Sequence, residues 1–199
     1  RPMSLDYLRG LREIADEFGV LLIFDEVQCG IGRTAKLFAH EWAGIEPDVL
    51  ASAKALAGGF PIGACLAKEA PAAALTSGSH GSTFGGNALT TAAAYAGTKF
   101  LIDNDIPGKT KEMEPYLLGR LNDLKDRFSF VAEVRGKGLL AAMEFESDIS
   151  PQVLTAANEA GLLLNAPRPT TIRFMPPLTV TREEIDGAVE RLGNALATI

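Results

Sequence analysis

The stretch "LLIFDEVQCGIGRTAKLFAHEW" (residues 21–42) carries an apolar run that ends abruptly in two acids, Asp25 and Glu26. An apolar run between turn signals predicts a buried strand, and aspartate is seldom buried without a partner. Two interpretations of Asp25 are open at this point. It caps the next turn, as aspartates at such positions commonly do. Alternatively, it awaits a positive charge that the sequence itself does not supply, at the strand end where open α/β sheets bind ligands.

Helix and strand patterns alternate on both sides of this stretch. Helical spacing follows Ser4, a predicted N-cap, and stops at Gly19. A turn-rich break at 103–109 separates two parts, 1–106 and 107–199. We expect an α/β architecture in the first part and a smaller α+β lobe in the second. The other predicted helices are 88–101 (capped by Asn87), 109–128, 150–160 and one that Thr181 opens in a capping box with Glu184, and the predicted strands are 20–25, 48–54, one within 58–71, two within 130–146 joined at Gly136 and Gly138, 161–166 and 171–176.

Composition excludes several classes of function. The 199 residues carry a net charge of -6 with scattered positive charges, which argues against a nucleic-acid or anionic-membrane surface. No apolar run approaches the roughly 18–20 residues of a membrane span, and the first residues lack the apolar region of a secretory signal. The only cysteines, Cys29 and Cys65, predict free thiols rather than a disulfide framework or a zinc site. We therefore expect a cytoplasmic protein without a metal.

Two further features bear on chemistry. Lys54 sits among alanine, leucine and glycine. A single lysine usually lies on a solvated face, whereas one in apolar surroundings has a lowered pKa and attacks carbonyl groups. The run "GSHGSTFGGN" (78–87) is either a flexible linker or a loop whose N–H and hydroxyl groups hold a phosphate. Neither a Walker A pattern nor G-x-G-x-x-G is present, so we expect no ATP or dinucleotide site.

One cofactor would use all three features. Pyridoxal 5'-phosphate (PLP) needs a lysine for covalent attachment, a carboxylate beside its pyridine nitrogen and a phosphate-binding loop. A carboxylate within a few ångströms of the ring nitrogen favours its protonated form, which draws electrons from the substrate. On this interpretation the cofactor brings the positive charge for which Asp25 is placed.

Three segments then resemble one family, the class III, ornithine-type aminotransferases: "LLIFDEVQCGIGRTAKLFAHEWAGIEPDVLASAKALAGGFPIGACLA", "HGSTFGGNAL" and "IRFMPPLTVTREEID". The resemblance covers nearly the whole chain and is greatest to the acetylornithine branch of the bacterial arginine pathway. It implies the fold type I architecture of PLP enzymes. Residues 1–106 would be the C-terminal part of the large PLP-binding domain, with a mixed, mostly parallel sheet and helices, and residues 107–199 the small C-terminal domain.

The resemblance also implies roles for residues around the cofactor ring. Lys54 would be the catalytic residue that carries the cofactor, and Asp25 would pair with the pyridine nitrogen. Gln28 would hydrogen-bond the phenolic oxygen, and Val27 would pack against a face of the ring. Glu26 would support the loop rather than take part in the chemistry.

Further roles lie outside the ring. Thr83, together with Ser82, would bind the phosphate of the neighbouring subunit's cofactor, so the resemblance implies a homodimer with a shared active site. Arg173 in "TIRFMPP" would bind a substrate carboxylate, for which its planar fork is suited. Without the family match, Arg173 would be interpreted as a surface residue of a strand.

The implied reaction moves an amino group between N-acetylornithine, or a related ω-amine, and 2-oxoglutarate. Ornithine, succinylornithine and 4-aminobutyrate aminotransferases share every quoted motif and remain alternatives. Family members are considerably longer and the missing part precedes residue 1, so we expect a fragment, a processed piece or an incomplete version of a longer enzyme. A non-catalytic fragment that keeps only fold and dimer surface is the alternative of another class. Ala35 and Ala88 depart from the glycine and proline that the family has there.

Overall fold

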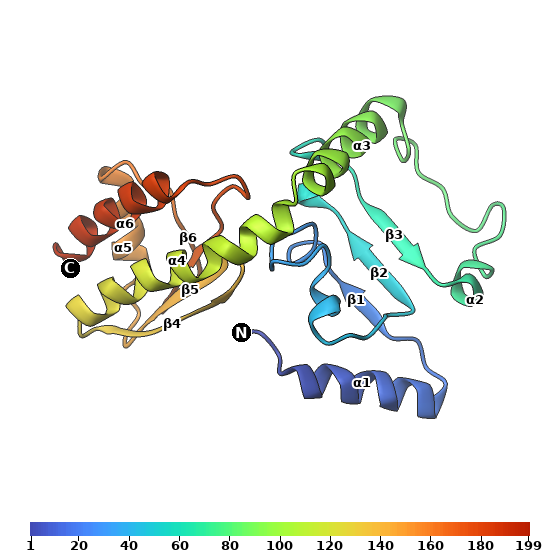
Figure 1. Cartoon of the computed structure of the whole chain (residues 1–199), viewed down its shortest axis with the longest axis horizontal. Coiled ribbons are helices and arrows are strands. Elements are labelled where there is room, and N and C mark those ends of the chain that lie inside the picture. Colours follow the sequence, from blue (N-terminus) through green and yellow to red (C-terminus); the bar gives the residue numbers. More distant parts are fainter. The chain divides into compact units, whose positions relative to one another are not determined.

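The computed structural model describes residues 1–199, which divide into two compact units. The N-terminal unit is Met3–Pro107, and the C-terminal unit is Gly108–Ile199 with Arg1–Pro2. The boundary predicted from the sequence, between residues 106 and 107, lies one residue before the observed boundary. Figure 1 shows that each unit has a sheet of its own. None of the helices combines the length and the apolar composition that crossing a membrane requires.

The N-terminal unit contains a three-stranded sheet in the order β1-β2-β3, with β1 parallel and β3 antiparallel to β2. The strands are β1 (Ile23–Asp25), β2 (Val49–Ser52) and β3 (Ala64–Ala67). The helices are α1 (Leu5–Phe18), α2 (Glu69–Ala72) and α3 (Ala88–Asp103), and two short 3-10 helices are η1 (Ala39–Trp42) and η2 (Lys54–Ala57).

Two helices of this unit begin where their capping residues predict. The Ser4 hydroxyl oxygen accepts a hydrogen bond from the Tyr7 backbone N–H at 3.2 Å and opens α1. The same helix ends at Gly19, whose φ of 61° is the left-handed conformation that glycine adopts at helix ends. The Asn87 side chain accepts from the Thr90 N–H at 3.0 Å and opens α3.

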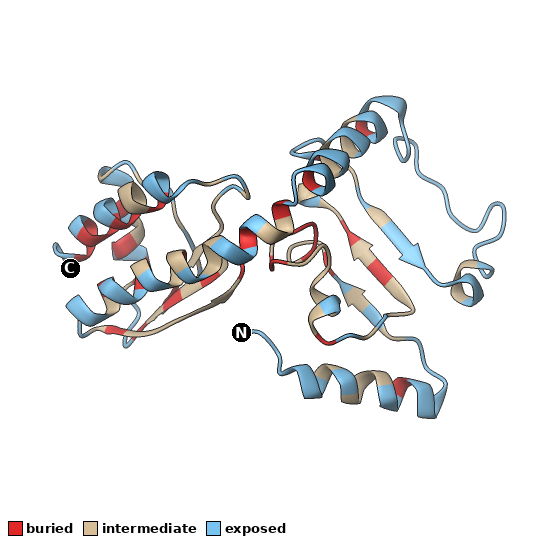
Figure 2. Ribbon diagram, in the orientation of Figure 1, coloured by how far each residue is buried: buried red, intermediate tan, exposed pale blue.

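The strand β1 is not the buried strand that the apolar run predicts. Ile23 is 61% exposed, and Leu21 just before the strand is 58% exposed. The side chains of a strand project from the two faces of a sheet, and the face of β1 that carries Ile23 and Asp25 is left uncovered in this unit. β1 is also the edge strand of the sheet, with a neighbouring strand only on the β2 side. Exposed residues also dominate β3 and α3, as Figure 2 shows. The N-terminal unit therefore leaves apolar side chains uncovered on several of its elements.

The C-terminal unit contains a four-stranded antiparallel sheet in the order β4-β5-β7-β6. Its strands are β4 (Val131–Lys137), β5 (Leu140–Phe145), β6 (Asn165–Arg168) and β7 (Thr171–Phe174), and its helices are α4 (Ile106–Arg127), α5 (Ser150–Glu159) and α6 (Arg182–Leu196). Helix α6 begins with the predicted capping box, because the Thr181 hydroxyl accepts from the Glu184 N–H and the Glu184 carboxylate accepts from the Thr181 N–H.

Three predicted boundaries in this region are wrong by a few residues. Helix α4 starts at Ile106 rather than 109. It follows Asp105 directly, and the φ of 46° at Asp105 interrupts the helical conformation between α3 and α4. The β4–β5 hairpin turns at 138–139, and Gly136 lies inside β4, where an added Cβ would come within 2.8 Å of the Leu140 carbonyl oxygen. Strand β6 begins at Asn165 rather than 161, because the Leu162 N–H still bonds the Ala157 carbonyl at the end of α5.

The core of the C-terminal unit lies where α4, α5 and α6 pack on the sheet. Leu121, Met143 and Leu192 are each at most 1% exposed. The complete buried cluster consists of Leu117, Leu121, Leu124, Val131, Leu139, Ala141, Met143, Phe145, Val153, Ile172, Ile185, Val189, Leu192 and Leu196. This unit therefore has a continuous hydrophobic core of its own.

Candidate active site

The carboxyl ends of β1 and β2 bring two of the predicted site residues to one edge of the sheet. The strands are parallel, and Asp25, the last residue of β1, pairs with Ala51 of β2. Lys54 follows Ala51 by three residues and begins η2. Parallel neighbours end at the same edge of a sheet, which is where ligands bind in open α/β sheets. A carboxylate and an amine therefore lie at neighbouring strand ends.

The backbone of Lys54 is strained. Its φ of 51° lies in the left-handed region, which costs a residue with a Cβ about 1–2 kcal/mol. Helix α3 supports the turn that follows, since the Thr98 hydroxyl donates to the Leu56 carbonyl at 3.5 Å. The Lys54 side chain is exposed, so the enclosed apolar surroundings that the sequence predicts are not found. Strain of this kind clusters at functional sites, where the surrounding structure maintains it.

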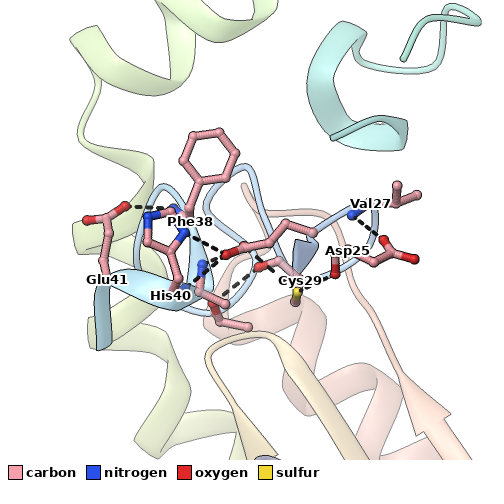
Figure 3. Close-up of polar contacts among 9 residues, drawn as sticks. Asp25, Val27, Cys29, Phe38, His40 and Glu41 are labelled. Atoms are coloured by element: carbon pink, nitrogen blue, oxygen red, sulfur yellow. Dashed lines mark hydrogen bonds and ion pairs between the residues drawn. The ribbon is translucent and has the colours of Figure 1, made fainter. Parts of the chain in front are cut away.

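Asp25 caps the turn that follows β1. Its Oδ1 accepts a hydrogen bond from the Val27 backbone N–H at 2.9 Å, as Figure 3 shows. This local bond uses one of the two carboxylate oxygens. Asp25 is exposed, so the expectation of an acid driven into a core is wrong, for the same reason that β1 is exposed. The capping interpretation is confirmed, and it leaves the carboxylate at the surface of the sheet edge.

Val27 and Gln28 occupy the turn directly after Asp25, and both are half-buried. The turn is tight, because the Gly30 N–H bonds the Glu26 carbonyl at 3.0 Å. An added Cβ at Gly30 would lie 2.8 Å from that same carbonyl oxygen, so glycine is required there. The geometry thus brings Asp25, Val27 and Gln28 together beside the strand end that precedes Lys54.

The loop beyond the turn folds back onto a buried carboxylate. Glu26 is 1% exposed. Its Oε2 accepts from the Ala39 N–H at 2.5 Å, and its Oε1 accepts from the His40 N–H and faces His40 Nδ1, both at 2.9 Å. Figure 3 shows His40 beside this group, with Asp25 and Val27 on the adjoining turn. The sequence assigns Glu26 to support of the loop but gives no sign that His40 is its partner.

Cys29 is an unreactive thiol in this arrangement. Burial, and then the neighbouring Glu26 carboxylate, raise the pKa of Cys29 to about 11. A thiol with this pKa stays protonated at neutral pH, and the thiolate is the nucleophilic form. Both Cys29 and Cys65 are free, as predicted.

Ser82 and Thr83 lie in the loop that leads from α2 to α3. Residues 73–89 of this loop region are exposed throughout. The Ser82 hydroxyl accepts a hydrogen bond from the Gly85 N–H at 3.0 Å, which shapes the turn locally. The loop therefore presents hydroxyl groups at the surface, and its phosphate role stays a prediction.

Arg173 belongs to the other unit. It lies in β7, paired with Ala142 of β5, and its Nη2 donates to the Asn165 side-chain oxygen at 2.8 Å. The residues that the structure brings together at the strand ends are therefore Asp25, Val27, Gln28 and Lys54. Arg173 is held by its own sheet, and its role toward a substrate stays a prediction.

Comparisons with known proteins agree with this arrangement. The family model for class-III aminotransferases matches residues 1–196. The acetylornithine aminotransferase of Methanocaldococcus jannaschii is 43% identical over 197 residues, which is 98% of this chain and 48% of that protein. Ornithine aminotransferase 2 of Staphylococcus aureus is 44% identical over 187 residues, 94% of this chain and 46% of that protein.

A solved structure extends the likeness to three dimensions. The acetylornithine aminotransferase from Elizabethkingia anophelis matches with a TM-score of 0.92 at 32% identity, over 98% of this chain and 52% of that one. The chain thus spans about half the length of the relatives it matches. With the family model matching almost every residue and the fold shared, the chain belongs to the class-III aminotransferase family.

Proposed function

We propose that the protein to which this chain belongs is a PLP-dependent aminotransferase, with Lys54 as its catalytic lysine. The observation that carries the proposal is the placement of Asp25 and Lys54 at the ends of neighbouring parallel strands. The strained φ of Lys54 supports it, because such a conformation is rarely kept where it has no use.

The residues at this edge fit PLP. The exposed amine of Lys54 can reach the cofactor's aldehyde, and the acid at the end of the neighbouring strand, Asp25, can face the ring nitrogen. When bound, PLP supplies an electron-withdrawing ring that makes the carbon next to the substrate nitrogen acidic. The negative charge of Asp25 would hold the proton on the ring nitrogen, and Gln28 would hydrogen-bond the phenolic oxygen of the ring. Val27 would pack against a face of the ring.

Lys54 then acts as an acid–base group. The Lys54 Nζ, once free of the cofactor, would accept the proton that leaves the amine-bearing carbon of the substrate and would donate the same proton to the carbon of the cofactor's former aldehyde group. The exposed position of the side chain supports this role, since Nζ must move between two partners. Arg173 binds a substrate carboxylate by two parallel hydrogen bonds, which fixes which bond to the reacting carbon is broken.

The substrates we propose are N-acetylornithine, or a related ω-amine, as donor and 2-oxoglutarate as acceptor, in arginine biosynthesis. The names of the relatives support this choice, and ornithine, succinylornithine and 4-aminobutyrate are the alternative donors. A panel of these four amines with 2-oxoglutarate distinguishes them by kcat/KM. A cytoplasmic setting, without nucleic-acid or membrane partners, stays a prediction from the sequence.

We further propose a homodimer in which Ser82 and Thr83 bind the phosphate of the partner's cofactor. The exposure of the whole 73–89 region supports this, because its hydroxyl groups are available to another molecule. A non-catalytic fragment is the competing proposal, since the chain spans about half the length of its relatives.

A covalent trapping experiment tests the central assignment. The chain is incubated with PLP and reduced with borohydride, and peptide mass spectrometry locates the modified lysine. We expect modification at Lys54, loss of it in Lys54→Ala and no change in Lys68→Ala, a matched exposed lysine that pairs with Asp48. Modification spread evenly over surface lysines would overturn the assignment, and no modification would favour the non-catalytic fragment.

A further inference from the structure

Glu26 is the one carboxylate of the N-terminal unit that is almost completely buried. A buried carboxylate is costly unless hydrogen-bond donors surround it. Glu26 has three such donors at 2.5–2.9 Å, and all come from the two consecutive residues Ala39 and His40. A carboxylate accepts only, so Nδ1 of the histidine carries the proton in the bond between them. The start and the end of the loop are therefore joined at a single side chain.

The loop that this junction closes is strained. Ile31 and Ala35 have φ values of 52° and 67°, in the region that residues with a Cβ avoid. Both are buried, at 2% and 3% exposure. Their conformations persist only if the ends of the loop are fixed by contacts elsewhere. The Glu26–His40 contact is such a contact, and the His40 ring is further held by stacking on Phe38, with the ring centres 5.8 Å apart.

The same residue fixes the end of β1. The Glu26 backbone N–H bonds the Ala51 carbonyl at 2.9 Å, and its carbonyl oxygen accepts from Gly30. Asp25 precedes Glu26, and its carboxylate bonds Val27, which follows it. The position of the Asp25 carboxylate is therefore set by the turn after β1. Glu26 fixes this turn both through its backbone hydrogen bonds and through its buried side chain.

We propose that Glu26, braced by His40, is a positioning residue that holds the Asp25 carboxylate, and with it Gln28, in place for the cofactor ring. The proposal rests on the proposed function for the role of the cofactor. What it predicts for the chain itself is the conformational order of the backbone of residues 25–30. Glu26 acts through the turn and does not touch the cofactor. A glutamine at this position would keep one acceptor oxygen and turn an NH₂ group toward backbone N–H donors.

The test measures backbone order by ¹⁵N relaxation in the 199-residue chain without cofactor. In the unmodified chain, we expect order parameters near ~0.85 for the amides of residues 25–30, and in Glu26→Gln values below ~0.6. Glu41→Gln is the matched control, because Glu41 also accepts a backbone N–H of this loop, from Phe38 at 2.7 Å, but lies exposed and away from the turn. It should leave residues 25–30 unchanged.

A second variant keeps the test decisive if Glu26→Gln does not fold. His40→Phe retains a ring to stack on Phe38 and removes both ring nitrogens, of which Nδ1 contacts Glu26, while the His40 backbone N–H remains, so we expect an intermediate fall in order at residues 25–30. Unchanged order in a folded Glu26→Gln chain, or in His40→Phe when the first variant is unfolded, overturns the proposal. Borohydride trapping on the unmodified chain is run in parallel, so that a failure of the Lys54 assignment is seen separately from a failure of the positioning role.

Discussion

In the C-terminal unit, 14 buried apolar residues form one core between sheet and helices, whereas the N-terminal unit leaves half of its large apolar side chains exposed. Of the 18 exposed large hydrophobic residues, only Leu163 and Ile199 lie outside the N-terminal unit. Half of its buried apolar residues are alanines, among them Ala15, Ala43 and Ala57. Figure 2 shows the difference as exposed surface on α3 and buried segments on α6.

The unit with the buried core is not the unit that carries most of the proposed site residues. The unit with the closed core contributes Arg173 alone to the proposed site, and the unit with the uncovered faces carries Asp25, Gln28 and Lys54. Contiguous exposed apolar surface marks places where a protein packs against something else. The strained residues Ile31, Ala35 and Lys54 also lie in this unit. The proposed chemistry thus lies in the unit that carries most of the exposed large apolar residues of the chain.

The largest expected effect comes from separating the units. Residues 108–199 expressed alone should unfold cooperatively on heating, because their core is complete within the segment. Residues 3–107 alone should show a weak transition and bind a hydrophobic dye, because their apolar faces stay open. Circular dichroism melting and dye fluorescence measure both. A sharp, dye-free transition for 3–107 would contradict the comparison.

A pair of leucine truncations sharpens the comparison within the intact chain. Leu121→Ala removes a side chain that is 1% exposed and should lower the free energy of unfolding by about 2–5 kcal/mol. Leu66→Ala removes the same atoms from β3, where the residue is 46% exposed, and should change that free energy by no more than about 0.5 kcal/mol. Urea titration measures both variants. Similar losses would mean that β3 is covered in solution.

A carboxylate of the C-terminal unit should make its stability depend on acid. The Thr170 hydroxyl, then Arg135 and Thr171, lower the pKa of Glu144 from 4.5 to about 2. A lowered pKa in the folded state stabilises the fold above the unfolded value near 4.5, and this contribution is lost as the pH falls toward 2. Because Glu144 is partly exposed and solvent screens it, Glu144→Gln should cost about 1–2 kcal/mol at pH 7.

The pH profile is the check on this prediction. The difference in unfolding free energy between the unmodified chain and Glu144→Gln should shrink steadily below pH 4.5 and vanish near pH 2. A difference that stays constant over this range would show that the glutamine variant loses packing rather than charge.

The smallest expected effect concerns strain in the N-terminal unit. Ala35→Gly should relieve about 1–2 kcal/mol of left-handed strain and lose about 0.5–1 kcal/mol through the freer unfolded chain. The net gain in unfolding free energy is about 0.5 kcal/mol. Ala43→Gly is the control, because Ala43 is also buried but has a φ of -84°, so it should only lose stability. A loss in both variants would mean that the Ala35 methyl group contributes more through packing than its backbone costs.

Local chemistry made much of the fold predictable. The caps at Ser4, Asn87 and Thr181 are side chains that bond residues three positions away, so the sequence alone locates them. The exposure of β1 was not predictable, because it depends on which elements pack over the faces of the sheet. The start of β6 was missed because the end of α5 uses the residues before it.

The candidate site shows the same division. Asp25 and Lys54 can be found from sequence because each follows an apolar run, and such runs end at the same edge of a parallel sheet. The pairing of Glu26 with His40 could not be found, because the two residues are 14 positions apart and the contact depends on how the loop closes. The exposure of Lys54 was missed for a related reason, since neighbouring alanines in sequence do not surround it in space.

The left-handed backbone at residue 54 has a consequence for how this protein would respond to selection. Glycine adopts that conformation with the least steric cost, because it has no Cβ. Selection for heat resistance alone, without selection for activity, should therefore favour glycine at this position. Such selection would remove the Lys54 amine from this strand end while it raised the stability of the fold. On the proposed function, lysine at position 54 costs the fold stability that glycine would restore, and selection for turnover is what would retain its amine.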